Sequence, residues 1–287
     1  MKFAVIDIGS NSVRLMMRAN GITLYKKVCT TRLGDRLSLT GALLEDAMAR
    51  TSEAVACFVA EAKADGAEQI SVFATAAVRS AKNGATFAER TEALCGVKVD
   101  VISGETEARI GLLGAVGRHA GAIVDVGGAS TEISVRDEER MIYSKSVNVG
   151  TVRLFDLCGS DEGKLNDLIG QKLSEYGKIP LSGRVYAIGG TATTLAAVSL
   201  RLEPFDASAV NGFSLTQEKL RALCDLILPL SVEERAKIRG MDRNKLDVIG
   251  GGALLLWRIA ERWGVPELVV SCADNLEGYA VEKGLDV

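Results

Sequence analysis

Histidine is almost missing from this sequence. His119 is the only one in 287 residues, and it lies in a glycine-rich connection between Gly117 and Gly121. A Ser-His-Asp or Cys-His mechanism would have to use this side chain, and we do not expect it to be catalytic there. The scarcity of histidine therefore directs the chemistry towards carboxylates.

Paired cysteines and long apolar runs are also missing. The six cysteines stand at positions 29, 57, 95, 158, 224 and 272, and none forms a Cys-x-x-Cys pair, which argues against zinc or thioredoxin-like chemistry. We expect reduced packing cysteines in a cytoplasmic protein. No uncharged apolar run reaches the roughly 18 residues of a membrane span, and the first apolar run is too short for a signal peptide. We therefore expect no contact with a membrane.

An excess of positive charge is absent as well. The net charge is −3, so no general surface for polyanions is predicted and no nucleic acid partner is expected. Aromatic residues make up only 5% of the chain, while Ala, Val, Leu and Gly are frequent. This composition favours α/β layers over a β-sandwich.

Two similar segments stand 118 positions apart. Residues 3–6 form an apolar run that leads into Asp7-Ile8-Gly9-Ser10-Asn11-Ser12, and residues 122–124 lead into Asp125-Val126-Gly127-Gly128-Ala129-Ser130. Each pattern predicts a strand, a tight glycine turn and a second strand. Because the offset is a domain length, we interpret the chain as two duplicated domains, 1–118 and 119–287.

The two glycine turns have the composition of phosphate-binding loops. Glycine exposes backbone N–H groups to an anion, and serine hydroxyls add donors. The predicted phosphate ligands are Gly9, Ser10, Asn11, Ser12, Gly127, Gly128 and Ser130. The leading Asp7 and Asp125 would repel phosphate, so their natural role is to hold a divalent cation beside it. A third turn, with Gly190 and Thr191, opens a helix and offers its N-terminus to an anion.

The remaining sequence alternates helices and strands. Periodic patterns predict helices over 44–62, 87–94, 106–116, 192–198 and 251–263, and strands over 69–75, 97–102, 185–188 and 268–271. Ser214-x-x-Gln217 and Ser231-x-x-Glu234 have the spacing of capping boxes. This alternation supports the α/β class.

The chain closely resembles the exopolyphosphatase/guanosine pentaphosphate phosphohydrolase (Ppx/GppA) family of the actin-like ATPase superfamily. The similarity lies in five motifs in the family's order, at residues 7–15, 74–79, 102–109, 125–132 and 189–195. The resemblance implies two actin-like (ribonuclease H-like) domains with a cleft between them. It also implies that the last helix can pack back on the first domain, and it favours a homodimer.

The family resemblance implies roles for particular residues. Water would attack the terminal phosphoryl group of polyphosphate in line, with Glu107 as general base and Arg79 clamping phosphate oxygens. Asp125 would be catalytic and, with Asp7 and Glu132, would hold Mg²⁺. Glu105 is the weaker candidate for the base, and Arg14 and Arg109 are equally compatible with ligand and salt-bridge roles.

Several positions depart from the family pattern. Ala129 replaces a glycine, Lys245 replaces an arginine, and Cys272, Asp274 and Leu276 stand in a segment that usually contains Ser-Asp and Gly-Leu-Arg. These changes keep three alternatives open: a guanosine pentaphosphate 5′-phosphohydrolase, a non-catalytic sensor of polyphosphate or guanosine nucleotides, and an actin-like kinase or ATPase. The expected partner is polyphosphate or a guanosine polyphosphate.

Overall fold

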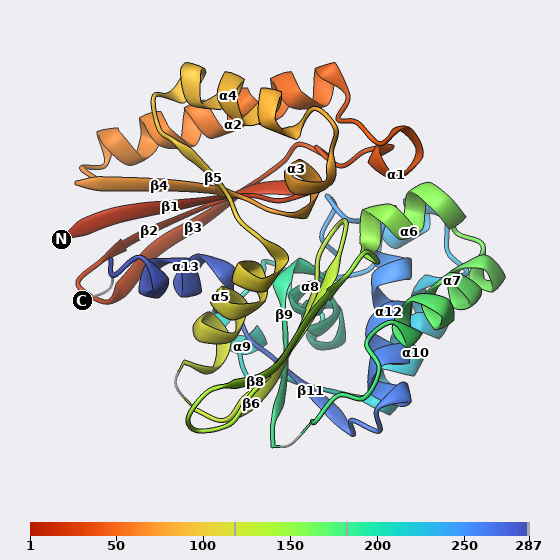
Figure 1. Cartoon of the computed structure of the whole chain (residues 1–287). Helices are drawn as coiled ribbons and strands as arrows, with labels where there is room; N and C mark the ends of the chain where they lie inside the picture. Colours follow the sequence, from red (N-terminus) through yellow and green to blue (C-terminus); the bar gives the residue numbers. More distant parts are fainter. Residues whose placement is uncertain (118, 182, 286–287) are drawn as a thin grey trace.

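A computed structural model describes residues 1–117, 119–181 and 183–285. It contains two α/β lobes, and each is built around one mixed sheet. Figure 1 shows the lobes facing each other, with the N-terminus and the last described helix, α13 (Asn275–Glu282), both beside the first lobe. The predicted α/β class is confirmed.

The first sheet has the order β3-β2-β1-β4-β5. β1 pairs with β2 in antiparallel fashion and with β4 in parallel fashion, so the first glycine turn joins two neighbouring strands. The strands are β1 (Lys2–Ile8), β2 (Ser12–Ala19), β3 (Ile22–Thr30), β4 (Gln69–Ala74) and β5 (Val99–Val101).

The second sheet repeats this arrangement. Its order is β10-β11-β9-β6-β7-β8, in which β6 again pairs with an antiparallel hairpin partner on one side and a parallel strand on the other. The strands are β6 (Gly121–Val126), β7 (Thr131–Arg136), β8 (Met141–Val147), β9 (Val185–Ile188), β10 (Ser214–Thr216) and β11 (Glu267–Val270). The shared order is the topology expected of two duplicated actin-like domains.

Helices cover the outer faces of both sheets (Figure 1). The first lobe contains α1 (Leu37–Thr40), α2 (Glu45–Ala64), α3 (Ala76–Ser80) and α4 (Gly84–Cys95). The second lobe contains α6 (Thr151–Cys158), α7 (Glu162–Ser174), α8 (Gly189–Leu200), α9 (Ala207–Val210), α10 (Gln217–Ile227), α11 (Val232–Arg235) and α12 (Ile249–Arg262).

Two further helices, α5 (Gly104–Val116) and α13 (Asn275–Glu282), lie between the lobes. α5 packs on the second sheet, where Leu112 and Val116 meet Ile123 and Ile188. α13 packs on the inner face of the first sheet, where the ring of Tyr279 stacks on that of Phe73 with 4.5 Å between the ring centroids. Each helix thus contacts a sheet on the other side of the expected boundary at residue 118, and the crossing of the two helices links the lobes.

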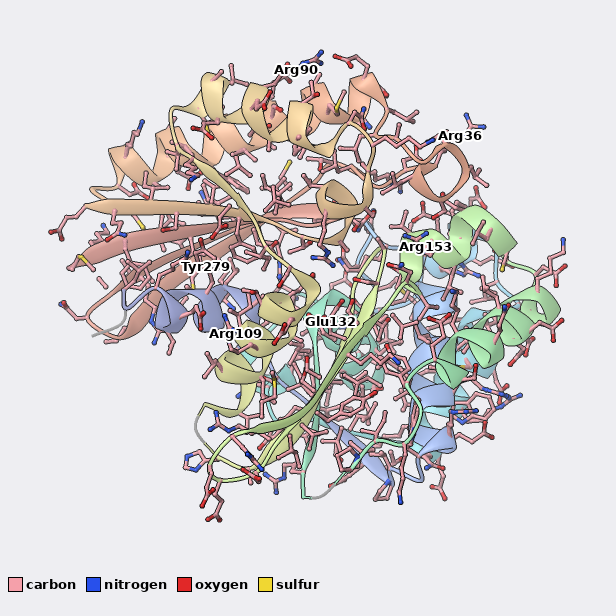
Figure 2. All side chains as sticks on the ribbon, viewed as in Figure 1. Arg36, Arg90, Arg109, Glu132, Arg153 and Tyr279 are labelled. Atoms are coloured by element: carbon pink, nitrogen blue, oxygen red, sulfur yellow. The ribbon has the colours of Figure 1, made fainter. Side chains whose placement is uncertain are left out.

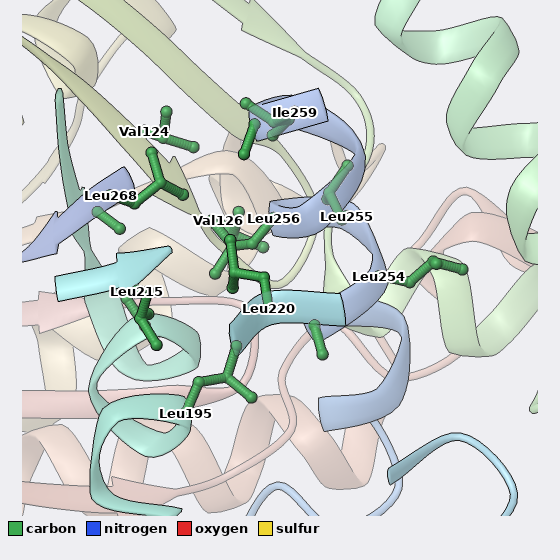
Figure 3. Packing of buried hydrophobic residues seen from close by; sticks show 14 of the residues in the cluster. Val124, Val126, Leu195, Leu215, Leu220, Leu254, Leu255, Leu256, Ile259 and Leu268 are labelled. Carbon is green, nitrogen blue, oxygen red and sulfur yellow. The ribbon is translucent and has the colours of Figure 1, made fainter. Parts of the chain in front are cut away.

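The largest core lies in the second lobe. Figure 3 shows Leu256 and Ile259 of α12 packing towards Val124 and Val126 of β6. These side chains are at most 3% exposed, so the strand that carries the second glycine turn is anchored in the interior. The turn itself follows directly after this fixed strand.

Most predicted elements are present, with shifts of a few residues at their ends. α5 begins at Gly104 and α8 at Gly189, earlier than expected, because both glycine turns run directly into helix. The capping box at Ser231 is confirmed, whereas the one at Ser214 is wrong: Ser214 belongs to β10, and Thr216 caps α10. In the described part of the chain no helix is long and apolar enough to cross a membrane.

Candidate active site

A cleft of about 1260 Å³ lies between the two lobes. Most of the predicted site residues line it: Asp7, Gly9, Ser10, Asn11, Ser12, Glu107, Asp125, Gly127, Gly128, Ser130, Gly190 and Thr191. Arg79 and Glu132 do not line the cleft, but each contacts a residue that does. His119 and Arg109 are outside the lining as well, and Arg109 pairs with Glu282 on α13.

The two glycine turns have the same geometry and touch each other. In the first turn the N–H of Gly9 donates to the carbonyl of Ser12 at 3.0 Å, and in the second the N–H of Gly127 donates to Ser130 at 3.0 Å. A Cβ atom added to Gly128 would lie 2.7 Å from Cβ of Ser10. A glycine is therefore needed at this position to let the two loops meet.

The second turn is fixed from behind by α6. The N–H groups of Thr151 and Val152 donate to the carbonyls of Gly127 and Gly128 at 2.9 Å each. Arg153, labelled in Figure 2, donates from Nε to the carbonyl of Ala129 at 2.9 Å. Ala129 does not have the positive φ that would require a glycine. Its methyl group is therefore compatible with the turn, and the departure from the family's glycine introduces no backbone strain.

Asp7, at the end of β1, forms part of a buried charge network. Arg14 on β2 donates from Nε to Asp7 Oδ2 at 3.0 Å and pairs through its terminal nitrogens with both Asp7 and Asp274. Arg14 therefore acts as a salt-bridge partner in this structure. Burial raises the pKa of Asp7 although Arg14 opposes the shift. The Oδ1 atom of Asp7 is buried and has no hydrogen-bond partner.

Asp125, at the equivalent place on β6, is also buried. Asn275 donates from Nδ2 to Asp125 Oδ2 at 3.1 Å, across 150 residues of sequence. Burial raises the pKa of Asp125 to about 6, with Arg14 acting in the opposite direction. The two equivalent aspartates of the duplicated domains thus share one low-dielectric space.

Glu107 lies in the first turns of α5, where Ser103 caps the helix. Its side chain is 7% exposed and pairs with Arg79 of α3 at 2.9 Å. Arg79 Nη1 also donates to the carbonyl of Ile102 at 2.9 Å. Burial raises the pKa of Glu107 to about 7, and the charge of Arg79 limits the shift. The group is therefore poised to exchange a proton near neutral pH.

Glu132, on β7, is held by two hydroxyl groups. Ser130 and Ser146 donate to its Oε1 at 2.7 and 2.6 Å. Figure 2 shows Glu132 beside α5, where the lobes meet. Burial, followed by the charges of Glu107 and Asp125, raises the pKa of Glu132 well above its usual range. A neutral Glu132 fits these surroundings better than a second charge beside Glu107.

The fit of a divalent cation can be tested on these carboxylates. The unpartnered Oδ1 of Asp7 is an acceptor that a cation would satisfy, and a cation would also offset the burial that raises the pKa of Asp125. Within residues 1–117, 119–181 and 183–285 no group of three His, Cys, Asp or Glu side chains is arranged to hold a metal ion. Magnesium commonly binds through one or two carboxylates, with water and phosphate oxygens completing its shell. Asp7 and Asp125 fit that mode.

Sequence reasoning did not assign three further groups in the cleft. Lys245, noted only as a departure from the family pattern, packs over Gly190 at the N-terminus of α8 and pairs with Asp242 at 3.0 Å. Lys237 and Arg243 line the same wall. Their positions depend on how residues 236–249 fold across α8. No local periodicity in the sequence predicts that course of the chain.

Known proteins resemble this chain over almost its whole length. The model of the Ppx/GppA phosphatase family matches residues 17–273. Exopolyphosphatase 2 of Mycobacterium tuberculosis is 32% identical, with 98% of each chain covered. The guanosine-5′-triphosphate,3′-diphosphate pyrophosphatase of Pseudoalteromonas translucida is 33% identical, with 99% of this chain and 58% of that longer protein covered.

A solved structure agrees with these relatives. The Ppx/GppA family member of Aquifex aeolicus is 29% identical to this chain and superimposes with a TM-score of 0.81. The match covers 99% of this chain and 98% of that one. The predicted fold and the predicted class of enzyme, a phosphoanhydride hydrolase, are confirmed. The chain belongs to the Ppx/GppA phosphatase family.

Proposed function

We propose that this protein releases inorganic phosphate from the terminal phosphoanhydride of polyphosphate. The observation that carries the proposal is the convergence in one cleft of both phosphate loops and a buried carboxylate, Glu107, whose pKa is raised to about 7. The relatives named as exopolyphosphatases support the choice of substrate.

The residues divide the reaction between them. The N–H groups of Gly9 and Gly127 are used inside the turns, and the Ser130 hydroxyl bonds Glu132. The other backbone N–H groups of the two turns and the hydroxyls of the first turn would bind the terminal phosphate and stabilise charge on its oxygens. Glu107 would accept a proton from the attacking water, and Arg79 at 2.9 Å would orient this carboxylate and reach phosphate oxygens once substrate is bound. A bound Mg²⁺ neutralises developing charge on phosphate oxygens. Asp7 and Asp125 would hold it, while Glu132 would remain bonded to Ser130 and Ser146.

The wall beyond the loops favours a long polyanion. Lys237, Arg243 and Lys245 line it and can pair with successive phosphates. A second candidate, guanosine pentaphosphate, is supported by the apolar side chains on the same wall: Leu202, Pro204, Phe205, Ile238 and Met241. Phe205 is 57% exposed, and such an aromatic ring can stack on a base.

A comparison of substrates tests the proposal. Phosphate release is measured with polyphosphate, guanosine pentaphosphate and ATP at equal concentrations in the presence of Mg²⁺. We expect the highest kcat/KM with polyphosphate. A preference for guanosine pentaphosphate would select the second candidate, and ATP hydrolysis alone would select the kinase or ATPase reading. Binding of polyphosphate without turnover of any substrate would identify a sensor.

Removal of divalent cations should stop the reaction. With EDTA in excess, we expect phosphate release to fall at least about 100-fold, because a metal ion supplies several kcal/mol of charge stabilisation in such transfers. Added Mg²⁺ should restore the rate. Undiminished release in EDTA would exclude the role given to Asp7 and Asp125.

The rate should depend on pH through Glu107. Because the base must be ionised, and burial raises its pKa to about 7, kcat/KM should fall about tenfold per pH unit below 7 and level off above it. kcat/KM reports the pKa of the free enzyme, so the phosphates of bound substrate do not enter this profile. Melting curves over the same pH range provide the control for folding. A profile that is flat down to pH 5 would contradict this assignment.

A further inference from the structure

The N-terminus of α13 contacts the aspartate of the second glycine turn directly and that of the first turn through Arg14. Asp274 caps the helix and accepts a hydrogen bond from the N–H of Leu276 at 3.0 Å, while its other oxygen pairs with Arg14, which holds Asp7. The next residue, Asn275, donates to Asp125 at 3.1 Å. One helix end therefore connects the two equivalent aspartates of the duplicated domains.

Packing alone does not account for an asparagine at position 275. Its side chain is buried, at 4% exposure, and its Oδ1 atom has no hydrogen-bond partner. A Cβ atom built on Gly111 would come within 2.8 Å of this oxygen, so the amide oxygen is directed towards α5. An apolar side chain of similar size would avoid the buried unpaired oxygen. The hydrogen bond that the amide donates to Asp125 is therefore what distinguishes asparagine from an apolar residue at this position.

The amide orientation is set by the charge of Asp125. With Nδ2 towards Asp125 the amide donates to a carboxylate oxygen, whereas the flipped amide would place two acceptors against each other. The hydrogen bond occupies Oδ2 and leaves Oδ1 of Asp125 directed towards Gly189, where a Cβ atom would lie at 2.8 Å. Asn275 thus fixes the plane of the Asp125 carboxylate, with one oxygen bonded to the amide and the other directed to the third glycine turn.

We infer that Asn275 is a positioning residue, which orients the Asp125 carboxylate for the cation and phosphate that it meets in the cleft. Asp274 has the corresponding role for Asp7, because it holds Arg14, which pairs with Asp7. The expected effect on turnover rests on the proposed function, whereas the expected effect on cation binding does not. It also explains a departure from the family pattern, since Asp274 and Asn275 provide polar contacts in a segment that lacks the usual Gly-Leu-Arg.

The variant Asn275→Leu tests the inference, because leucine keeps the branched shape and the number of heavy atoms of asparagine and removes the donor. We expect kcat with polyphosphate to fall about 10- to 100-fold, since loss of a partner behind a metal-binding carboxylate has effects of that size. KM should change less than about threefold, because the phosphate loops are untouched. Mn²⁺ binding, followed by electron paramagnetic resonance without substrate, should weaken by about tenfold or more.

The matched control is Asn166→Leu on α7, whose amide donates to the carbonyl of Glu162 one turn earlier and does not line the cleft. It should leave Mn²⁺ binding and kcat unchanged. The melting temperature of Asn275→Leu should fall by only a few degrees, because the buried oxygen of Asp125 loses its donor while the unpaired amide oxygen is removed.

The two proposals fail in different ways. A parent that binds Mn²⁺ but hydrolyses nothing, with weaker binding in Asn275→Leu, would overturn the proposed function and keep the positioning role. An active parent with unchanged kcat and Mn²⁺ affinity in Asn275→Leu would overturn the positioning role. So would a parent that binds no Mn²⁺ at all, or an Asn275→Leu chain that fails to fold, because a purely positioning residue leaves the fold intact.

Discussion

Replacing Glu107 by Gln should slow phosphate release from polyphosphate by about 10²- to 10⁴-fold, the usual contribution of a positioned general base. The amide has nearly the same shape and can still accept a hydrogen bond from Arg79, which lies 2.9 Å from the native carboxylate. It cannot accept the proton of the attacking water. The loss should therefore appear in kcat, measured by phosphate release under saturating substrate.

Glu105→Gln provides the matched control. Glu105 lies in the same first turn of α5 but is exposed, and it does not line the cleft. Its replacement should leave kcat within about twofold, the small effect expected of a surface substitution. If Glu107→Gln retained the parent rate, Glu107 would not be the base. If Glu105→Gln were the slow variant, the two carboxylates would have to exchange roles.

The second large effect is expected at the crossing of α5 and α13. A Cβ atom on Gly278 would lie 1.6 Å from the carbonyl oxygen of Ile110, and one on Gly114 would lie 2.0 Å from the carbonyl oxygen of Asp274. Both obstacles are backbone atoms, so they cannot move without moving a helix. Gly278→Ala should lower the free energy of unfolding by about 3 kcal/mol or more, because overpacking against fixed atoms is destabilising.

The opposite result is expected for Gly170→Ala. Gly170 lies inside α7, where an added Cβ atom meets nothing within 4 Å. Alanine there should raise the free energy of unfolding by about 0.5–1 kcal/mol through its higher helix propensity. Urea unfolding of both variants measures the difference. A Gly278→Ala protein as stable as the parent would show that the two helices are not packed as closely as described.

The duplicated topology could be predicted because its signal is local. Each glycine turn follows an apolar run and precedes another, and this order fixes a hairpin at the edge of the parallel strands. The separation of 118 residues between Asp7 and Asp125 then implies two lobes. Packing follows from the same pattern: Val5 and Ile6 of β1, and Ile123 and Val124 of β6, are all essentially buried.

The contacts made by α13 could not be predicted in this way. Arg14 and Asp274 are 260 residues apart, and Asn275 and Asp125 are 150 apart. No periodicity links such distant positions, and the segment around Asp274 is notable in the sequence only as a departure from the family pattern. For the same reason, the choice between ligand and salt-bridge roles for Arg14 required the positions of Asp7 and Asp274 in space.

The sensor interpretation loses part of its basis in the structure. It was motivated by Ala129, Cys272, Asp274 and Leu276. Ala129 is accommodated without a positive φ, and Asp274 pairs with Arg14 in the cleft. Leu276 is buried in the core between α13 and the first sheet. These three positions are therefore built into the fold, and the active-site carboxylates remain in place beside them.

Hydrolysis of polyphosphate in ¹⁸O-labelled water tests the central claim most directly. If water activated by Glu107 attacks the terminal phosphoryl group, each released phosphate should carry one solvent oxygen after correction for the enrichment, as mass spectrometry would show. The polyphosphate should lose one phosphate per turnover. Release of phosphate without solvent oxygen, or no release from polyphosphate in the presence of Mg²⁺, would contradict the account.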